Sequence, residues 1–111
     1  MLKNIINEFR QANGQPALVI NNGQENDHCL WHSKYMANTG CVHAPSYFLH
    51  DKAEAVAFRG FYRDYQEALR AIIFEDFAWS NKHRIILLFS DNLAAAFHVE
   101  RNCVFVTIRG W

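Results

Sequence analysis

Histidine is the residue type in this chain best suited to chemistry near neutral pH. The six histidines have unperturbed pKa values near 6.5, so an imidazole here can transfer a proton or bind a metal. Ser80 and His83 are one helical turn apart, which would place a hydroxyl beside a base. A nucleophilic pair also needs a third group that orients the base. Because Ser80 directly precedes an apolar run with helical spacing, we interpret it first as a helix cap.

The three cysteines offer a second kind of chemistry. Cys29, Cys41 and Cys103 are odd in number and lack the Cys-x-x-Cys spacing of a zinc or redox site. This pattern favours reduced thiols with a structural role. A Cys41 to Cys103 disulfide is the less favoured alternative, because spacing alone does not bring two α-carbons within bridging distance.

The N-terminal half of the chain must position some of these groups, and its apolar residues recur at helical spacing. Apolar residues recur with that spacing over residues 2–12, and Gly14 with Pro16 ends the run. A second helix follows, capped by Asn26 or Asp27 and stopped by Gly40. Its apolar face carries His32, which we expect to be packed and hydrogen-bonded rather than a metal ligand. Cys29, Ser33 and Met36 share that face.

The C-terminal half alternates between strand and helix patterns. Residues 41–52 are expected to form a loop, and a short strand near 53–58 is closed by Gly60. A third helix turns inward a set of apolar and aromatic side chains: Tyr62, Tyr65, Leu69, Ile72 and Ile73, with Phe74 and Phe77 also predicted in the core. Ser80 begins a fourth helix that runs to about Phe89. Residues 94–99 and 103–109 form a hairpin around Glu100-Arg101-Asn102.

Composition limits the class of protein. The 111 residues are 50% hydrophobic and predict one globular domain, 1–111, of α+β class because helices precede strands without a βαβ repeat. Lys plus Arg equals Asp plus Glu at eleven each, so no net field favours nucleic acid as a partner. No run approaches the roughly 18 apolar residues of a membrane span, and the start does not resemble a signal peptide, which predicts a cytosolic protein.

Several stretches together resemble the CAP superfamily (cysteine-rich secretory, antigen 5 and pathogenesis-related proteins) in its bacterial form. In chain order the similar stretches are Ile6–Arg10 with Asn13–Leu18, His32–Ala37 with His43-Ala44-Pro45, Ala53–Ala57, Phe77–Leu87 and Ala94–Trp111. They correspond to the family's "NxxR…GxPxL", "HSxxMA…H" and "GENIA" patterns, to its aromatic-Ser…His-Arg helix and to its last hairpin. Ala53 and Ala55 replace the Gly and Asn of "GENIA", and Asn81-Lys82 stand where bacterial relatives carry Pro-Gly.

The resemblance implies a three-layer α-β-α sandwich with about four helices around a small, mainly antiparallel sheet. It also implies a cleft to which His43, Glu54 and His83 contribute as matches of two family histidines and one glutamate. Ser80 stands at the position of the second family glutamate and is counted among the cleft residues, and Glu75 is the nearest carboxylate in sequence. Members of the family are usually secreted.

His43, Glu54 and His83 are a sensible ligand set for zinc or another divalent metal, with a fourth position left for water. The alternative is that these side chains bond to one another and to water in a polar cleft. We therefore expect a module that binds a small ligand, a lipid or a protein through this cleft, without catalysis. A zinc-dependent hydrolase and a structural scaffold with a vestigial site are the other hypotheses.

Overall fold

The computed structural model describes residues 1–20, 23–40 and 52–111 of the chain. The elements in chain order are α1 (Leu2–Ala12), α2 (Gln24–Thr39), β1 (Ala53–Gly60), α3 (Tyr65–Ala71), the π-helix η2 (Ile72–Phe77), α4 (Asn81–Phe89), β2 (Leu93–Glu100) and β3 (Cys103–Gly110). Within these ranges no helix is long and apolar enough to cross a membrane.

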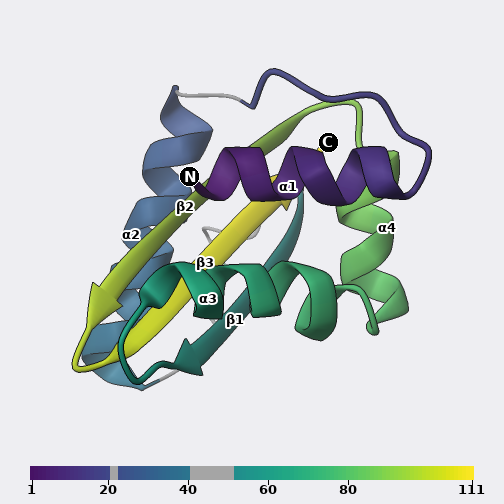
Figure 1. Cartoon of the computed structure of the whole chain (residues 1–111). Coiled ribbons are helices and arrows are strands. Elements are labelled where there is room, and N and C mark those ends of the chain that lie inside the picture. Colours follow the sequence, from purple (N-terminus) through teal and green to yellow (C-terminus); the bar gives the residue numbers. More distant parts are fainter. Residues whose placement is uncertain (21–22, 41–51) are drawn as a thin grey trace.

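The three strands form one antiparallel sheet in the order β1-β3-β2. Figure 1 shows α2 on one face of this sheet, and α1 and α3 on the other. The η2 and α4 helices belong to the second face, where they complete the layer that α1 and α3 begin. The described part of the chain is thus a three-layer α-β-α sandwich, which confirms the predicted α+β class.

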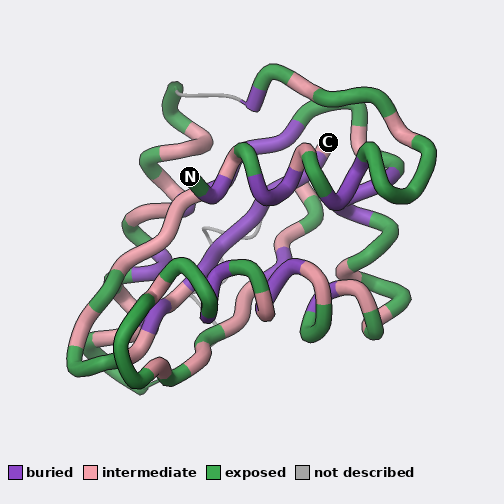
Figure 2. Tube along the Cα trace, viewed as in Figure 1, coloured by how far each residue is buried: buried purple, intermediate pink, exposed green. Residues whose placement is uncertain are grey.

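The two faces of the sheet follow from the alternation of side chains along a strand. On the face toward α1, α3 and α4, the register aligns Ala55, Ile108 and Ala95, all of which are buried. They join Ile6 and Phe9 of α1 in one hydrophobic core, and Figure 2 shows buried residues concentrated along β3, the first part of β2 and the inner sides of the helices. Burying an Ile or Phe side chain contributes roughly 1.5–3 kcal/mol, so this core is the main source of stability.

Asn7 and Arg10 of α1 fix the segment that follows the helix. The Asn7 amide donates to the Leu18 carbonyl and accepts from the Leu18 N–H, both at 2.9 Å. The buried Arg10 guanidinium donates to the carbonyls of Pro16 at 2.9 Å and Leu87 at 2.6 Å. Gly14 adopts φ +81°, which a glycine tolerates without strain. The stretch that resembles "NxxR…GxPxL" is therefore a clamp that joins α1, its exit loop and α4.

Two local expectations were wrong, and a third was confirmed only in position. The N-cap of α2 is Gly23 rather than Asn26 or Asp27, so the helix starts without a side-chain cap. Ser80 is the N-cap of α4 by position, but its hydroxyl makes no capping hydrogen bond. Tyr62 precedes α3 and is 89% exposed, because the helix is capped two residues later by Asp64, whose carboxylate accepts from the Gln66 N–H.

The predicted hairpin is confirmed, with a tighter turn than expected. β2 and β3 are joined by Arg101 and Asn102 alone, at φ 52° and 57°. Two consecutive residues with positive φ are typical of a type I′ turn, whose twist matches that of the paired strands. Gly40 likewise ends α2 in the left-handed region at φ +73°, as predicted.

Candidate functional site

Glu54, the predicted site carboxylate of β1, faces α2. Its neighbour Ala55 points into the core, so the alternation of the strand places Glu54 on the opposite face. There its Oε1 atom lies 2.6 Å from Nδ1 of His32, and the two side chains are only 9% and 4% exposed. The expectation that His32 is a packed, partnered histidine is confirmed, and its partner is a residue of the predicted site.

Arg109 completes this buried polar cluster. It is the register partner of Glu54 on β3 and is 2% exposed. Its Nε atom lies 3.2 Å from Oε2 of Glu25 and 3.9 Å from Oε2 of Glu54. Lys52 lies 3.6 Å from the other oxygen of Glu25 and over the ring of Trp111. Both carboxylates therefore face the Arg109 guanidinium, and Glu25 also faces the Lys52 ammonium, between α2 and the sheet. We call Glu25, His32, Glu54 and Arg109 the interlayer cluster.

Sequence reasoning missed two members of the interlayer cluster. Arg109 alternates in phase with Cys103, Phe105 and Thr107, so the sequence places this charge on a largely uncharged face of the strand. Glu25 lies in the first turn of α2 and carries no comparable sequence signal. A buried arginine requires a partner, so Arg109 could have been recognised from the strand pattern and Glu25 could not.

Cys29 lies against the same cluster but is not a nucleophile. The thiol is fully buried, and burial raises its pKa from 9.0 to about 12, with further contributions from the carboxylates of Glu54 and Glu25. Arg109 opposes this rise without cancelling it. Cys29 thus lies near the carboxylates of Glu54 and Glu25, and its sulfur stays protonated and shielded at neutral pH. Cys29 and Cys103 are both free thiols.

His83 lies in the other helical layer. Its ring packs edge-on against Phe77 of the core, with ring centroids 4.9 Å apart. Burial, with a smaller effect from the adjacent Lys82, lowers the pKa of His83 below 6.5. The imidazole is therefore neutral at physiological pH, the form that binds metals or accepts a hydrogen bond.

The structure does not bring Glu54 and His83 into contact with each other. The Glu54 carboxylate is engaged on the α2 side of the sheet, whereas His83 contacts Phe77 on the α3 and α4 side. His43 lies outside the described residues, so the convergence of all three stays a prediction. Across residues 1–20, 23–40 and 52–111, no group of three or more His, Cys, Asp or Glu side chains is placed to hold a metal ion.

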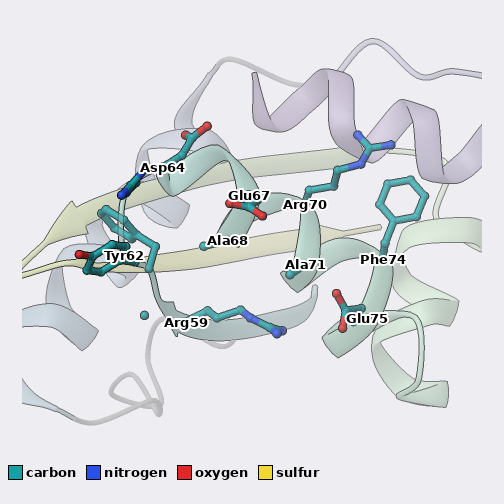
Figure 3. Close-up of a pocket in the computed structure, with 12 residues that line it drawn as sticks. Arg59, Tyr62, Asp64, Glu67, Ala68, Arg70, Ala71, Phe74 and Glu75 are labelled. Carbon is teal, nitrogen blue, oxygen red and sulfur yellow. The ribbon is translucent and has the colours of Figure 1, made fainter.

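A groove of about 620 Å³ lies elsewhere, between the end of β1 and the outer side of α3 and η2. Figure 3 shows Arg59 on one side, Glu67 and Arg70 on the other, and Glu75 at one end. The floor includes Ala68 and Ala71, whose small side chains leave the space open. Glu75 was considered from sequence as a substitute for the missing second glutamate, and it is exposed at this groove.

The cations of the groove are engaged, and two of its carboxylates are not. Arg59 pairs with Asp76 at 3.0 Å and Arg70 with Glu8 at 2.7 Å. Arg63 lies over the ring of Tyr62, 5.4 Å from its centroid. Among the described residues no cation pairs with Glu67 or Glu75, so these two carboxylates remain available to a ligand.

Comparison of the chain with models of known protein families gives no match, and comparison with curated proteins finds none that is significantly similar. The resemblance to the CAP superfamily therefore rests on the motifs alone.

Proposed function

We propose that this chain is a divergent CAP-like domain that acts as a non-catalytic binding module. The order of the motifs supports the family, and their residues have long-range roles in the fold. Asn7 and Arg10 clamp the exit loop of α1, and His32 pairs with Glu54 across two layers. Motif residues that act together in this way are what a shared architecture requires.

The engagement of Glu54 carries the proposal. A general base or a metal ligand must present its carboxylate to the reacting atom. Here one oxygen lies 2.6 Å from His32, the other faces Arg109, and the side chain is 9% exposed. Releasing this carboxylate would leave the Arg109 charge with Glu25 alone, deep in the interlayer cluster. Glu54 thus serves to hold α2 on the sheet.

The hydrolase hypothesis needs zinc at His43, Glu54 and His83, with a bound water as nucleophile. Two observations weigh on it. The neutral imidazole of His83 favours metal binding, but Glu54 does not offer a free oxygen in this arrangement. The described residues therefore fit a zinc site poorly, and we derive no reaction step through the metal.

For the ligand we propose a cationic group that binds in the groove beside α3. The free carboxylates of Glu67 and Glu75 give the charge, and Phe74 with Tyr62 gives apolar surface. A lipid chain fits this lining less well, because six of the twelve lining residues are charged. Small polyamines and lysine-containing peptides have the required chemistry. If no such compound binds, the scaffold hypothesis is favoured.

The test is a titration of ¹⁵N-labelled protein with spermidine, tetralysine and, as anions, citrate and phosphate. We expect shift changes for Gly60, Glu67 and Glu75 with the two cations only. The Glu67→Gln/Glu75→Gln variant should lose this response. The matched control Asp27→Asn/Asp91→Asn removes two exposed carboxylates elsewhere and should keep it. Equal loss in both variants would indicate unspecific charge attraction and would contradict the site.

A parallel measurement distinguishes the hydrolase hypothesis from the proposed binding module. Purified protein is assayed with and without zinc on peptide, ester and phosphoester substrates, and its zinc uptake is measured by calorimetry. We expect no turnover above background. Zinc-dependent turnover that His43→Ala and His83→Ala abolish would replace the binding module with the hydrolase.

A further inference from the structure

The α4 helix exposes apolar side chains on its outer surface. Its inner residues Ile86, Leu87 and Leu88 are buried, as the core requires. Ile85 and Phe89, however, are 54% and 67% exposed. They are four residues apart and therefore adjacent on one side of the helix. Trp79, two residues before the helix begins, is 84% exposed.

Basic side chains border this apolar surface. Lys82 and Arg84 are exposed, and Lys82 lies one turn before Ile85. The stretch from Phe77 to Ser90 contains no carboxylate. Of the acids that flank it in sequence, Asp76 is paired with Arg59, and Asp91 follows the helix. The two exposed cations are therefore not balanced by an acid within the same stretch of chain. We call these exposed side chains, Trp79 just before the helix and Lys82, Arg84, Ile85 and Phe89 on it, the α4 face.

We propose that the α4 face docks onto the surface of an anionic lipid bilayer. Exposed Trp, Phe and Ile with flanking Lys and Arg are the composition of helices that lie in the membrane interface. The nine residues of α4 span about 14 Å, so the helix rests in the interface rather than crossing it. The proposal is independent of the groove beside α3, which no residue of the α4 face lines.

Charge also argues against a second copy of the chain as the occupant. A two-fold contact places the same patch on both subunits. Lys82 and Arg84 of one copy would then lie close to their counterparts in the other, without a carboxylate on the face to separate them. A bilayer rich in phosphatidylserine supplies the opposite charge to the cations and an apolar layer to Ile85 and Phe89.

The experiment measures binding of the whole chain to vesicles of phosphatidylcholine, alone or with about a third phosphatidylserine. We expect binding to the anionic vesicles only, weakened by high salt, with a blue shift of tryptophan emission that Trp79→Phe removes. The Lys82→Gln/Arg84→Gln variant should bind about 25-fold more weakly, since each basic side chain near an anionic surface contributes about fivefold. The Ile85→Ser/Phe89→Ser variant should lose binding.

Two matched variants serve as controls. Lys34→Gln/Arg101→Gln makes the same change in net charge at exposed sites off α4, and Val19→Ser/Phe58→Ser removes two exposed apolar side chains. Both should bind as the unmodified chain does. The proposal is overturned if the chain ignores anionic vesicles, or if the controls weaken binding as much as the α4 variants. It is equally overturned if the unmodified chain does not bind vesicles and forms a dimer that the Ile85→Ser/Phe89→Ser substitutions dissociate.

Discussion

The Nδ1 atom of His32 lies 2.6 Å from the Oε1 atom of Glu54, and this contact joins α2 to the edge strand β1. Both residues belong to stretches that resemble one family, and the structure shows what they do together. The pair is shielded from water, and Arg109 and Glu25 extend it into a cluster. The first prediction concerns its energetics.

Replacing Glu54 with Gln should destabilise the fold. The substitution keeps the shape of the side chain but removes a charge that faces His32 and Arg109 in a buried site. Breaking a buried ion pair on one side costs about 3 kcal/mol or more, because the remaining charge loses its partner. Urea denaturation should show this loss. Glu67→Gln, at an exposed carboxylate, should stay within about 0.5 kcal/mol of the unmodified chain. Equal midpoints for the two variants would show that the cluster has no role in stability.

Cys29 should be unreactive in the native protein. Its thiol is buried and its pKa is raised to about 12, so neither access nor thiolate is available at neutral pH. The rate of reaction with Ellman's reagent is measured in two variants that each keep one of these thiols. Cys41→Ser/Cys103→Ser keeps Cys29, and Cys29→Ala/Cys41→Ser keeps the half-buried Cys103. We expect Cys103 to react on the order of 100-fold faster, since Cys29 reacts only after the structure opens. Comparable rates would place Cys29 near the surface.

The same pKa shift predicts a loss of stability at alkaline pH. The unfolded thiol loses its proton near 9.0, whereas the folded thiol keeps it until about 12. The native state therefore binds more protons in this window, and the free energy of unfolding falls as pH rises through it. Cys29→Ala should reduce that fall, and Cys103→Ala should not. A parallel decline in both variants would assign the effect to other groups.

His83 should make the fold less stable as pH falls. Burial, and secondarily Lys82, holds its pKa below the 6.5 of the unfolded chain. Below about pH 6.5 the unfolded state takes up a proton that the native imidazole resists, so the free energy of unfolding decreases. The slope of the free energy of unfolding against pH, between about pH 5 and 7, should be smaller in His83→Gln than in the unmodified chain. His98→Gln is the control, because His98 lies in a partly exposed pair with Glu100. An NMR titration that gives His83 a pKa above 6.5 would contradict the prediction.

The elements of the fold and its α+β class could be predicted because they depend on local patterns, whereas the three layers were expected only from the family resemblance. Helical spacing in residues 2–12 predicts α1, and Gly40 predicts the end of α2. The two runs around Arg101-Asn102 predict the hairpin of β2 and β3. The site could not, because Glu54, His32 and Arg109 are far apart in sequence and meet only through the register of β1 with β3 and the packing of α2. The π-helical turn Ile72–Phe77 was also missed, since its side chains continue a helical pattern without interruption.

Gly110 marks a close approach between β3 and α4, which leads to the last prediction. A Cβ atom at this position would meet the Oγ atom of Ser90, and would lie 2.9 Å from Cγ2 of Ile86. Gly110→Ala should therefore push α4 away from the sheet and cost about 1–3 kcal/mol, the range for overpacking in a core. Gly60→Ala is the matched control on the same sheet, because its Cβ would lie 3.7 Å from the nearest atom, the Asn102 carbonyl oxygen. Thermal unfolding of both variants measures the difference. If the melting temperature of Gly110→Ala equals or exceeds that of Gly60→Ala, α4 does not pack on β3 as closely as described.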